Sequence, residues 1–302
     1  MQVMTVLGPI SPNDLGFTQT HEHFLCNMFW VTWVTNEVLN DEDLAVEEAM
    51  LFKKAGGSSI VDVTNMGLRR DAQALRRIAE RTGLNIIMGC GWYREPFYPP
   101  ELKQRSTNDL AAEMIRDITK GVGDTGIKAG IIGEIGVNTD YISPAEERVL
   151  RAAARAHKAT GAAISTHGEV CPIGLAQLDM LEEEGVDLRR VIVGHADSYL
   201  RLDYHEGIAQ RGAYVQYDGI GRKHIYPDHR RVSMLVEMIK RGYVEHLLLA
   251  TDRCWRSDLH AYGGVGYDHI LVNFLPMLRQ AGVSEEQIHI ITVENPKRVL
   301  PF

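Results

Sequence analysis

Short apolar runs alternate with longer amphipathic stretches along most of the chain. The short runs have the length and composition of strands that are buried on both faces. Eight such runs are predicted as strands: Phe17–His23, Ser59–Asn65, Asn85–Gly91, Gly130–Ile135, Ala162–His167, Arg190–His195, Ala213–Tyr217 and His246–Asp252.

The stretch Ala145–Thr160 shows the pattern that lies between these runs. Its apolar positions, such as Val149, Ala152 and Ala156, recur with the period of a helix. Ser143 and Pro144 precede it as an N-cap and a proline of the first turn. A glycine that can adopt a left-handed conformation ends such a helix. Glycines follow this and other predicted helices at Gly83, Gly161, Gly185 and Gly242.

Regular alternation of strand and helix predicts an α/β protein with a parallel sheet. Eight strands favour a closed (β/α)₈ TIM barrel over a doubly wound sheet, which usually has fewer. The 302 residues suit one barrel, and no Pro/Gly/Ser-rich linker divides them, so we expect a single barrel domain over residues 1–302. The long aromatic segment Phe24–Asn40 follows the first strand, where barrel loops usually contact substrates.

Composition excludes several classes of function. The formal net charge of −8 argues against a nucleic-acid-binding protein, because phosphate backbones require a basic face. The four cysteines are scattered without a C-x-x-C pair, which is typical of reduced thiols in the cytoplasm. Residues 1–10 lack the basic start of a signal peptide, and no apolar run approaches the ~18 residues of a membrane span. We therefore expect a cytoplasmic protein that does not bind membranes.

Histidines and acids stand at the ends of the predicted strands. His21 and His23 form an H-x-H pair, and residues two apart in a strand point to the same face. Glu134, His167, His195 and Asp252 end the fourth, fifth, sixth and eighth strands. Each alone could be a core or surface residue, but the carboxyl ends of barrel strands meet at one mouth, where barrel enzymes keep their active sites. Together they predict a metal site, with Zn²⁺ expected and Mn²⁺, Co²⁺ or Fe²⁺ as alternatives.

Several motifs along nearly the whole chain resemble the phosphotriesterase family of the amidohydrolase superfamily. They are Thr5–Ile10, Thr20-His21-Glu22-His23, the helix Ala152–Gly161, Thr166-His167, Gly194-His195, Gly264–Asp268 and Glu294-Asn295-Pro296. Many members of the family bridge two metals with a carbamylated lysine at the end of the fourth strand. This chain has Gly133 and Glu134 there, and so resembles the branch of phosphotriesterase homology proteins, in which a glutamate bridges.

The resemblance implies a binuclear centre and a hydrolytic reaction. It implies that His21, His23 and Asp252 hold the more buried metal, that His167 and His195 hold the more exposed one, and that Glu134 bridges them. A metal-bridging hydroxide would attack the substrate, and Asp252 would accept its proton. Family members often form homodimers, so the resemblance also implies a homodimer.

Substrate residues follow from the same resemblance. Tyr93 matches a tyrosine near the metals of the family's lactonases, whereas Gly219 stands where those lactonases have an arginine. Lys223 and Arg256 resemble loop positions that grip an anionic group in sugar-lactone hydrolases, and Arg222 is a weaker candidate. These residues favour a small-molecule substrate that is a lactone or carboxylic ester, anionic or sugar-derived. The alternatives are an amidase, a phosphoesterase or phosphotriesterase that uses the same site, and a non-catalytic barrel that binds a metabolite.

Overall fold

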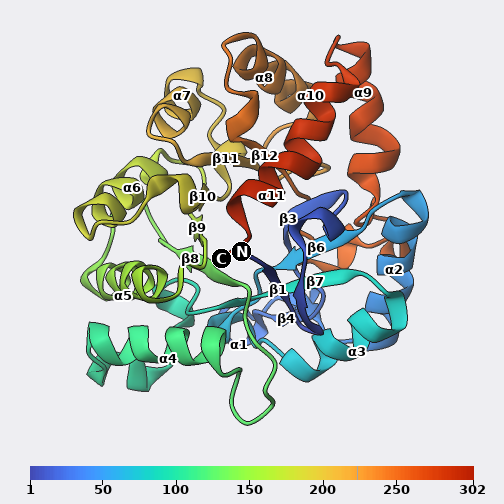
Figure 1. The fold of residues 1–302 in the computed structure, drawn as a ribbon. Helices are drawn as coiled ribbons and strands as arrows, with labels where there is room; N and C mark the ends of the chain where they lie inside the picture. Colours follow the sequence, from blue (N-terminus) through green and yellow to red (C-terminus); the bar gives the residue numbers. More distant parts are fainter. Residues whose placement is uncertain (223) are drawn as a thin grey trace.

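Eight parallel strands form a ring in the centre of the protein. The computed structural model describes residues 1–222 and 224–302 (Figure 1). In sheet order the strands are β3 (Thr18–Glu22), β6 (Ser59–Asp62), β7 (Asn85–Cys90), β8 (Ile131–Gly136), β9 (Ile164–His167), β10 (Val191–Val193), β11 (Tyr214–Tyr217) and β12 (Leu247–Leu249). The backbone N–H of Asp252 donates to the carbonyl of His21 at 3.2 Å, which joins the last strand to the first. The predicted (β/α)₈ barrel is confirmed, and each of the eight strands of the ring overlaps its predicted run.

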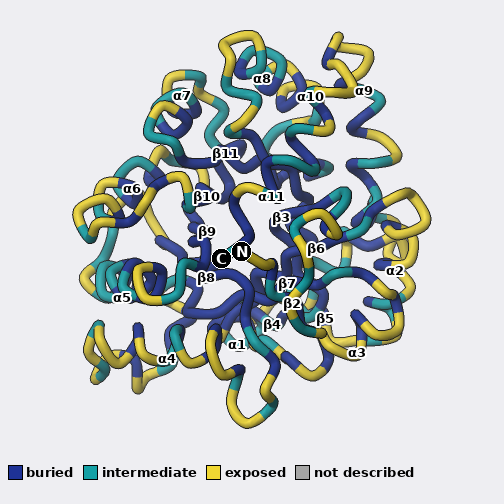
Figure 2. The backbone as a smooth tube through the Cα atoms, viewed as in Figure 1, coloured by how far each residue is buried: buried dark blue, intermediate teal, exposed yellow. Residues whose placement is uncertain are grey.

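Helices surround this ring, with their exposed faces turned outward (Figures 1 and 2). They are α2 (Glu42–Ala55), α3 (Ala72–Thr82), α4 (Thr107–Thr119), α5 (Pro144–Thr160), α6 (Ile173–Glu183), α7 (Leu202–Gln210), α8 (Asp228–Lys240), α9 (Leu275–Gln280), α10 (Glu285–His289) and α11 (Asn295–Val299). Helix α5 begins as predicted, because Ser143 and Glu146 form a reciprocal capping box. It ends at Gly161, whose φ of 81° places it in the left-handed region.

The interior of the barrel is a packed core. Residues from most of the strands, including Val61, Ile87, Ile131, Ile192 and Leu248, form one buried cluster. A larger apolar cluster fills the space between the strands and the helices. The strands are therefore held rigidly on both faces, which fixes the side chains at their carboxyl ends.

The two termini lie together near the barrel axis (Figure 1). The hairpin of β1 (Val3–Thr5) and β2 (Gly8–Ile10) starts there, and Gln2 and Phe302 exchange two backbone hydrogen bonds. The long segment after β3 is partly ordered by β4 (Cys26–Asn27), α1 (Phe29–Thr32) and β5 (Val38–Leu39). Among the described helices, none combines the length and the apolar character that a bilayer crossing requires.

Candidate metal centre and its cavity

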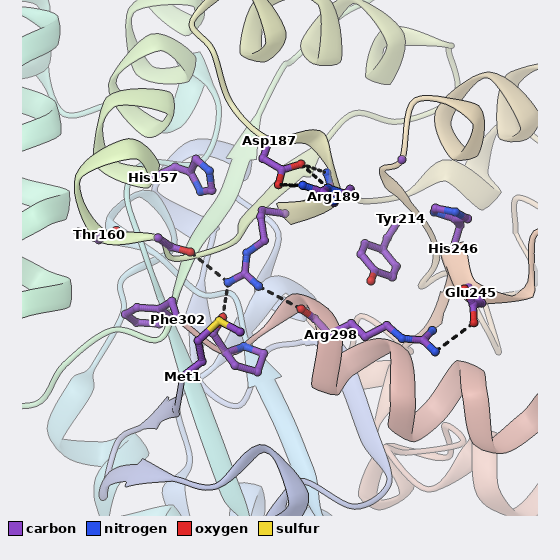
Figure 3. Close-up of a pocket in the computed structure, with 14 residues that line it drawn as sticks. Met1, His157, Thr160, Asp187, Arg189, Tyr214, Glu245, His246, Arg298 and Phe302 are labelled. Carbon is purple, nitrogen blue, oxygen red and sulfur yellow. Dashed lines mark hydrogen bonds and ion pairs between the residues drawn. The ribbon is translucent and has the colours of Figure 1, made fainter.

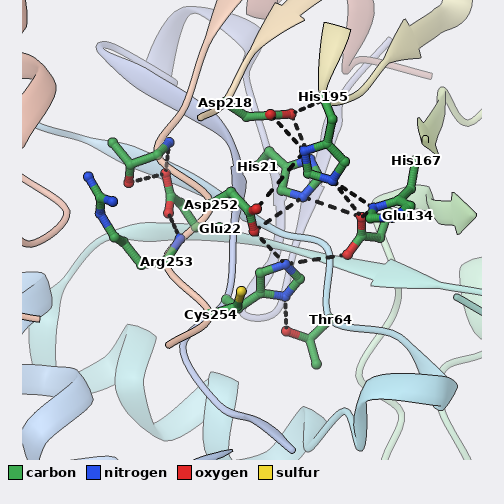
Figure 4. A network of polar contacts seen from close by, with 12 residues as sticks. His21, Glu22, Thr64, Glu134, His167, His195, Asp218, Asp252, Arg253 and Cys254 are labelled. Carbon is green, nitrogen blue, oxygen red and sulfur yellow. Dashed lines mark hydrogen bonds and ion pairs between the residues drawn. The ribbon is translucent and has the colours of Figure 1, made fainter. Parts of the chain in front are cut away.

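The six residues predicted as metal ligands meet at the carboxyl ends of the strands. Figure 4 labels all of them except His23. All six are buried, none being more than 5% exposed. They fall into two groups whose potential ligand atoms lie within 4.8 Å of one another: His21, His23 and Asp252, and Glu134, His167 and His195. His21 is also grouped with His195 and Asp218. These histidine and carboxylate clusters could hold metal ions.

The first group has the spacing of a metal shell. His23 Nε2 lies 3.2 Å and His21 Nε2 lies 3.7 Å from Asp252 Oδ1. Ligand atoms around a tetrahedral Zn²⁺ lie about 3.4 Å apart, because each bond is about 2.1 Å long. His21 Nε2 is buried without a hydrogen-bond partner, although buried polar atoms in proteins almost always have one. An ion would satisfy this nitrogen, so the residues fit a divalent metal.

Glu134 lies between the two groups. Its Oε1 is 3.4 Å from His23 Nε2, whereas its Oε2 is 2.8 Å from His167 Nδ1 and 3.4 Å from His195 Nε2. Burial alone would raise the pKa of the Glu134 carboxyl, but the charges of His167 and His21 hold that pKa well below its usual value. An ionised carboxylate with one oxygen on each side is suited to bridge two cations.

A second layer of residues orients the imidazoles. Thr64 Oγ1 lies 2.8 Å from His23 Nδ1, and the Tyr93 hydroxyl lies 3.2 Å from His167 Nε2. Asp218 lies 2.7 Å from His195 Nδ1 through Oδ1, and its Oδ2 accepts the backbone N–H of the same histidine. Such contacts fix the tautomer of each ring, so that its other nitrogen is free for a metal.

The loop that carries Asp252 is held by Glu22, the middle residue of the His-Glu-His motif (Figure 4). The Glu22 carboxylate accepts backbone hydrogen bonds from Thr251 at 2.6 Å and Arg253 at 3.0 Å, on either side of Asp252. Asp252 has a φ of 48° and His195 a φ of 54°, in the left-handed region that non-glycine residues rarely adopt. Strained backbone of this kind persists where surrounding contacts enforce it, and it clusters at functional sites.

A small cavity of about 80 Å³ opens next to these residues. Tyr93 is part of its wall, as the resemblance implied, together with Arg94, Arg222, Glu37, Glu169 and Trp255. Arg222 donates to Asp252 Oδ2 at 2.5 Å. From the sequence, Arg222 was a weaker candidate for substrate binding than Lys223 and Arg256, and Arg94 was not identified. The reason is that a loop sequence does not show where its side chains point.

Arg256, predicted as a substrate-binding residue, is not among the residues that line this cavity. Arg256 donates to the Val38 carbonyl at 2.8 Å and to Asn40 Oδ1 at 3.3 Å, and it lines a neighbouring cavity instead. Its guanidinium ties the loop after β12 to the segment after β3. Lys223, the other predicted anion-binding residue, lies outside the described residues.

A larger cavity, of about 740 Å³, lies at the opposite end of the barrel (Figure 3). Its walls come from residues that precede β9 to β12 and from both chain ends, Met1 and Phe302. Arg190 there donates to the carbonyls of Gly161 and Arg298, each at 3.0 Å. None of the candidate metal clusters found among the described residues is at this end. In barrels the amino-terminal end serves stability, so the smaller cavity is the candidate active site.

Comparisons with known proteins agree with this geometry. The model of the phosphotriesterase family matches residues 1–300. The phosphotriesterase homology protein of Escherichia coli is 38% identical over 289 residues, which are 96% of this chain and 99% of that protein. Its crystal structure, with phosphate in the active site, superimposes with a TM-score of 0.92 at 37% identity, covering 95% of this chain and 99% of that one.

Two further relatives carry the names of specific activities. An N-acetyltaurine hydrolase of Xenopus tropicalis is 33% identical over 348 residues, which cover 100% of this chain and 98% of that protein. A lactonase of Listeria monocytogenes has a TM-score of 0.94 at 26% identity, covering 100% of this chain and 99% of that one.

Proposed function

The chain belongs to the phosphotriesterase family of hydrolases, and we propose that it cleaves a small carboxylic acid derivative, in the first place an N-acyl amide. The observation that carries this proposal is the position of Glu134 between two groups of buried ligands. We assign one divalent metal to His21, His23 and Asp252 and a second to His167 and His195, with Glu134 shared by both. Zn²⁺ is the first candidate for both positions, because imidazole and carboxylate ligands suit it.

When bound, the two ions lower the pKa of a shared water and polarise the scissile carbonyl group. The residues of the chain then have separate roles. Asp252 accepts the proton of the nucleophile on its carboxylate and passes it to the leaving nitrogen or oxygen. Arg222 donates a hydrogen bond to one lone pair of Asp252 Oδ2, so that the other lone pair of this oxygen remains available for the proton. Tyr93 keeps the His167 ring in its orientation.

The size of the cavity supports a small substrate. At about 80 Å³ it is well below the roughly 300–1,000 Å³ of pockets that enclose drug-sized ligands. A bulky phosphotriester would not fit without rearrangement of the walls, whereas an acetyl group would.

Between carbonyl substrates, the amide is favoured by the N-acetyltaurine hydrolases, whose identity to this chain extends over its full length. A lactone or carboxylic ester is the second candidate. It is supported by the likeness to a lactonase and by the position of Tyr93 against His167.

A matched pair of substrates separates these two reactions. N-acetyltaurine and O-acetylisethionate differ only in the amide nitrogen and the ester oxygen, so their kcat/KM values, each divided by the uncatalysed rate, compare the bonds directly. Metal content is measured by mass spectrometry on the same samples. Asp252→Asn removes the proposed proton acceptor, and Asp203→Asn, at a side chain that is 71% exposed, is its matched control.

We expect about two metals per chain and a larger rate enhancement for the amide. A larger enhancement for the ester, or for γ-lactones, would assign the second function. Hydrolysis of aryl diethyl phosphates alone, or no hydrolysis after loading with Zn²⁺ or Mn²⁺, would contradict both.

A further inference from the structure

Arg94 is held in the cavity wall by two aromatic rings. It follows Tyr93 directly in the loop after β7, and its Cζ lies 5.0 Å from the ring centre of Tyr93 and 5.3 Å from that of Phe97. A guanidinium that stacks on a ring keeps its N–H groups in the plane, where they are free to bind an anion. The aromatic pair therefore fixes the direction of the donors without using them.

These donors have no acceptor in the part of the chain that the structure describes. Arg94 Nε is buried without a hydrogen-bond partner, although the residue as a whole is half-buried, and no ion pair among the described residues involves Arg94. Two arginines with buried side chains differ, since Arg70 is paired with Asp117 and Arg231 with Asp197. A buried donor without an acceptor costs free energy, so the arrangement is suited to a ligand that supplies one.

The acidic residues of the cavity leave Arg94 available. Glu37 and Glu169 both line the cavity, but neither is paired with Arg94. Glu169 stands two residues after the proposed metal ligand His167, which ends β9. Glu37 Oε2 is buried without a hydrogen bond. In a rival arrangement, the Glu37 carboxylate moves toward Arg94 and neutralises its charge.

Arg94 is also close to the reacting centre. The Tyr93 ring that it stacks on has its centre 4.6 Å from that of His167. One aromatic residue thus connects the guanidinium to a proposed metal ligand, and a group bound by Arg94 would be only a short chain away from a carbonyl group at the metals.

We propose that Arg94 binds an oxyanion at the far end of the substrate, a sulfonate or carboxylate separated from the scissile amide by a short linker. The substrate class is then an N-acyl derivative of a small amino sulfonic or amino carboxylic acid. This inference rests on the proposed hydrolysis of N-acyl amides and adds the residue that selects among them.

The test uses the full metal-loaded protein with N-acetyltaurine and N-ethylacetamide, which lacks the sulfonate. The variants are Arg94→Met, which keeps the stem without the charge, and Arg94→Lys, which keeps the charge without the planar fork. Glu37→Gln tests the rival arrangement. The control is Arg189→Met at the other end of the barrel, where the side chain is 79% exposed. Binding of ethanesulfonate is measured separately by calorimetry, which needs no turnover.

In Arg94→Met we expect the preference for N-acetyltaurine, taken as the ratio of the two kcat/KM values, to fall about tenfold or more, with a similar loss of ethanesulfonate affinity. Arg94→Lys should recover part of both, and Arg189→Met neither. An equal effect on charged and neutral substrates would overturn the inference. So would a rise of the same preference in Glu37→Gln without a fall in Arg94→Met, because it would show that Glu37 neutralises Arg94 in the wild type.

The two proposals fail in different ways. If the wild type hydrolyses neither amide but binds ethanesulfonate through Arg94, the amidase proposal is wrong and the anion site stands. If it hydrolyses amides but ethanesulfonate affinity is unchanged in Arg94→Met, the anion site is wrong and the amidase stands.

Discussion

Arg222 donates to Oδ2 of Asp252 at 2.5 Å, while Oδ1 of the same carboxylate lies 3.2 Å from His23 Nε2. Each oxygen of Asp252 therefore has a different neighbour, a cation on one side and the proposed metal ligands on the other. Burial alone would raise the pKa of this carboxyl, but Arg222 and His23 hold it well below its usual value. Asp252 thus remains a carboxylate that can bind a metal and receive a proton.

Replacement of Asp252 by asparagine should separate binding from catalysis. Asp252→Asn keeps one oxygen for a metal and preserves the side-chain volume, so we expect the fold and most of the metal to remain. Loss of the proton acceptor should lower kcat by about 10²–10⁴-fold. Steady-state kinetics, metal analysis and circular dichroism on one sample check this. Turnover near that of the wild type would show that another group takes the proton.

Replacement of Arg222 should lower the stability of the metal-free protein more than that of the metal-loaded protein. Both partners of this ion pair are buried, and removal of one leaves an uncompensated charge that costs about 3–5 kcal/mol. A bound cation would compensate Asp252 in place of Arg222. We therefore expect Arg222→Met to lower the Tm of the chelated protein by more than that of the metal-loaded protein. Equal shifts in both states would argue against a metal on Asp252.

The framework and the clustering of the candidate ligands could be predicted because both depend on local pattern. Apolar runs define the strands, and a residue at the end of a strand has only one possible location in a parallel barrel. His21, His167 and His195 were therefore found without any knowledge of their contacts. The glycine after α5 was identified for a similar reason, since few other residues adopt its left-handed φ.

The cavity walls could not be predicted in the same way. Arg94 and Arg256 both lie in loops after strands, yet one stacks beside the candidate metal centre and the other bonds to the segment after β3. Only tertiary contacts decide between these orientations. Glu22 was likewise overlooked, because a residue between two histidines of a strand points to the opposite side and carries no ligand signal. Its contacts to Thr251 and Arg253 join segments that are far apart in the sequence.

Tyr93 should act on the metal through His167. Its hydroxyl lies 3.2 Å from His167 Nε2, and burial raises the pKa of the phenol well above its usual value, so it stays neutral. Tyr93→Phe removes this contact and should weaken metal affinity or activity about 10-fold, as for other residues that orient a ligand. Competition with a chelator, followed by metal analysis, measures the affinity. Unchanged affinity with a raised KM would instead assign Tyr93 to the substrate.

His205 should make the free energy of unfolding fall more steeply as the pH becomes acidic. It is fully buried in α7, with Nδ1 2.8 Å from the Tyr217 hydroxyl and Nε2 2.9 Å from the Ala196 carbonyl. Burial lowers the pKa of this imidazole from 6.5 to about 4. Between these two values the unfolded chain binds a proton that the folded chain does not, so stability is present above pH 6.5 and is lost as the pH falls toward 4.

The difference between the pKa values of His205 in the unfolded and folded chain corresponds to about 3 kcal/mol of stability. His205→Gln keeps a donor and an acceptor but does not titrate, so it should be less stable than the wild type at pH 7 and lose about 3 kcal/mol less between pH 7 and pH 4. Urea unfolding of chelated protein across this range measures the difference without a contribution from metal release. If the stabilities of the two proteins changed in parallel with pH, His205 would have to be protonated in the folded state. The Ala196 carbonyl and the Tyr217 oxygen would then each accept a hydrogen bond from one of its ring nitrogens.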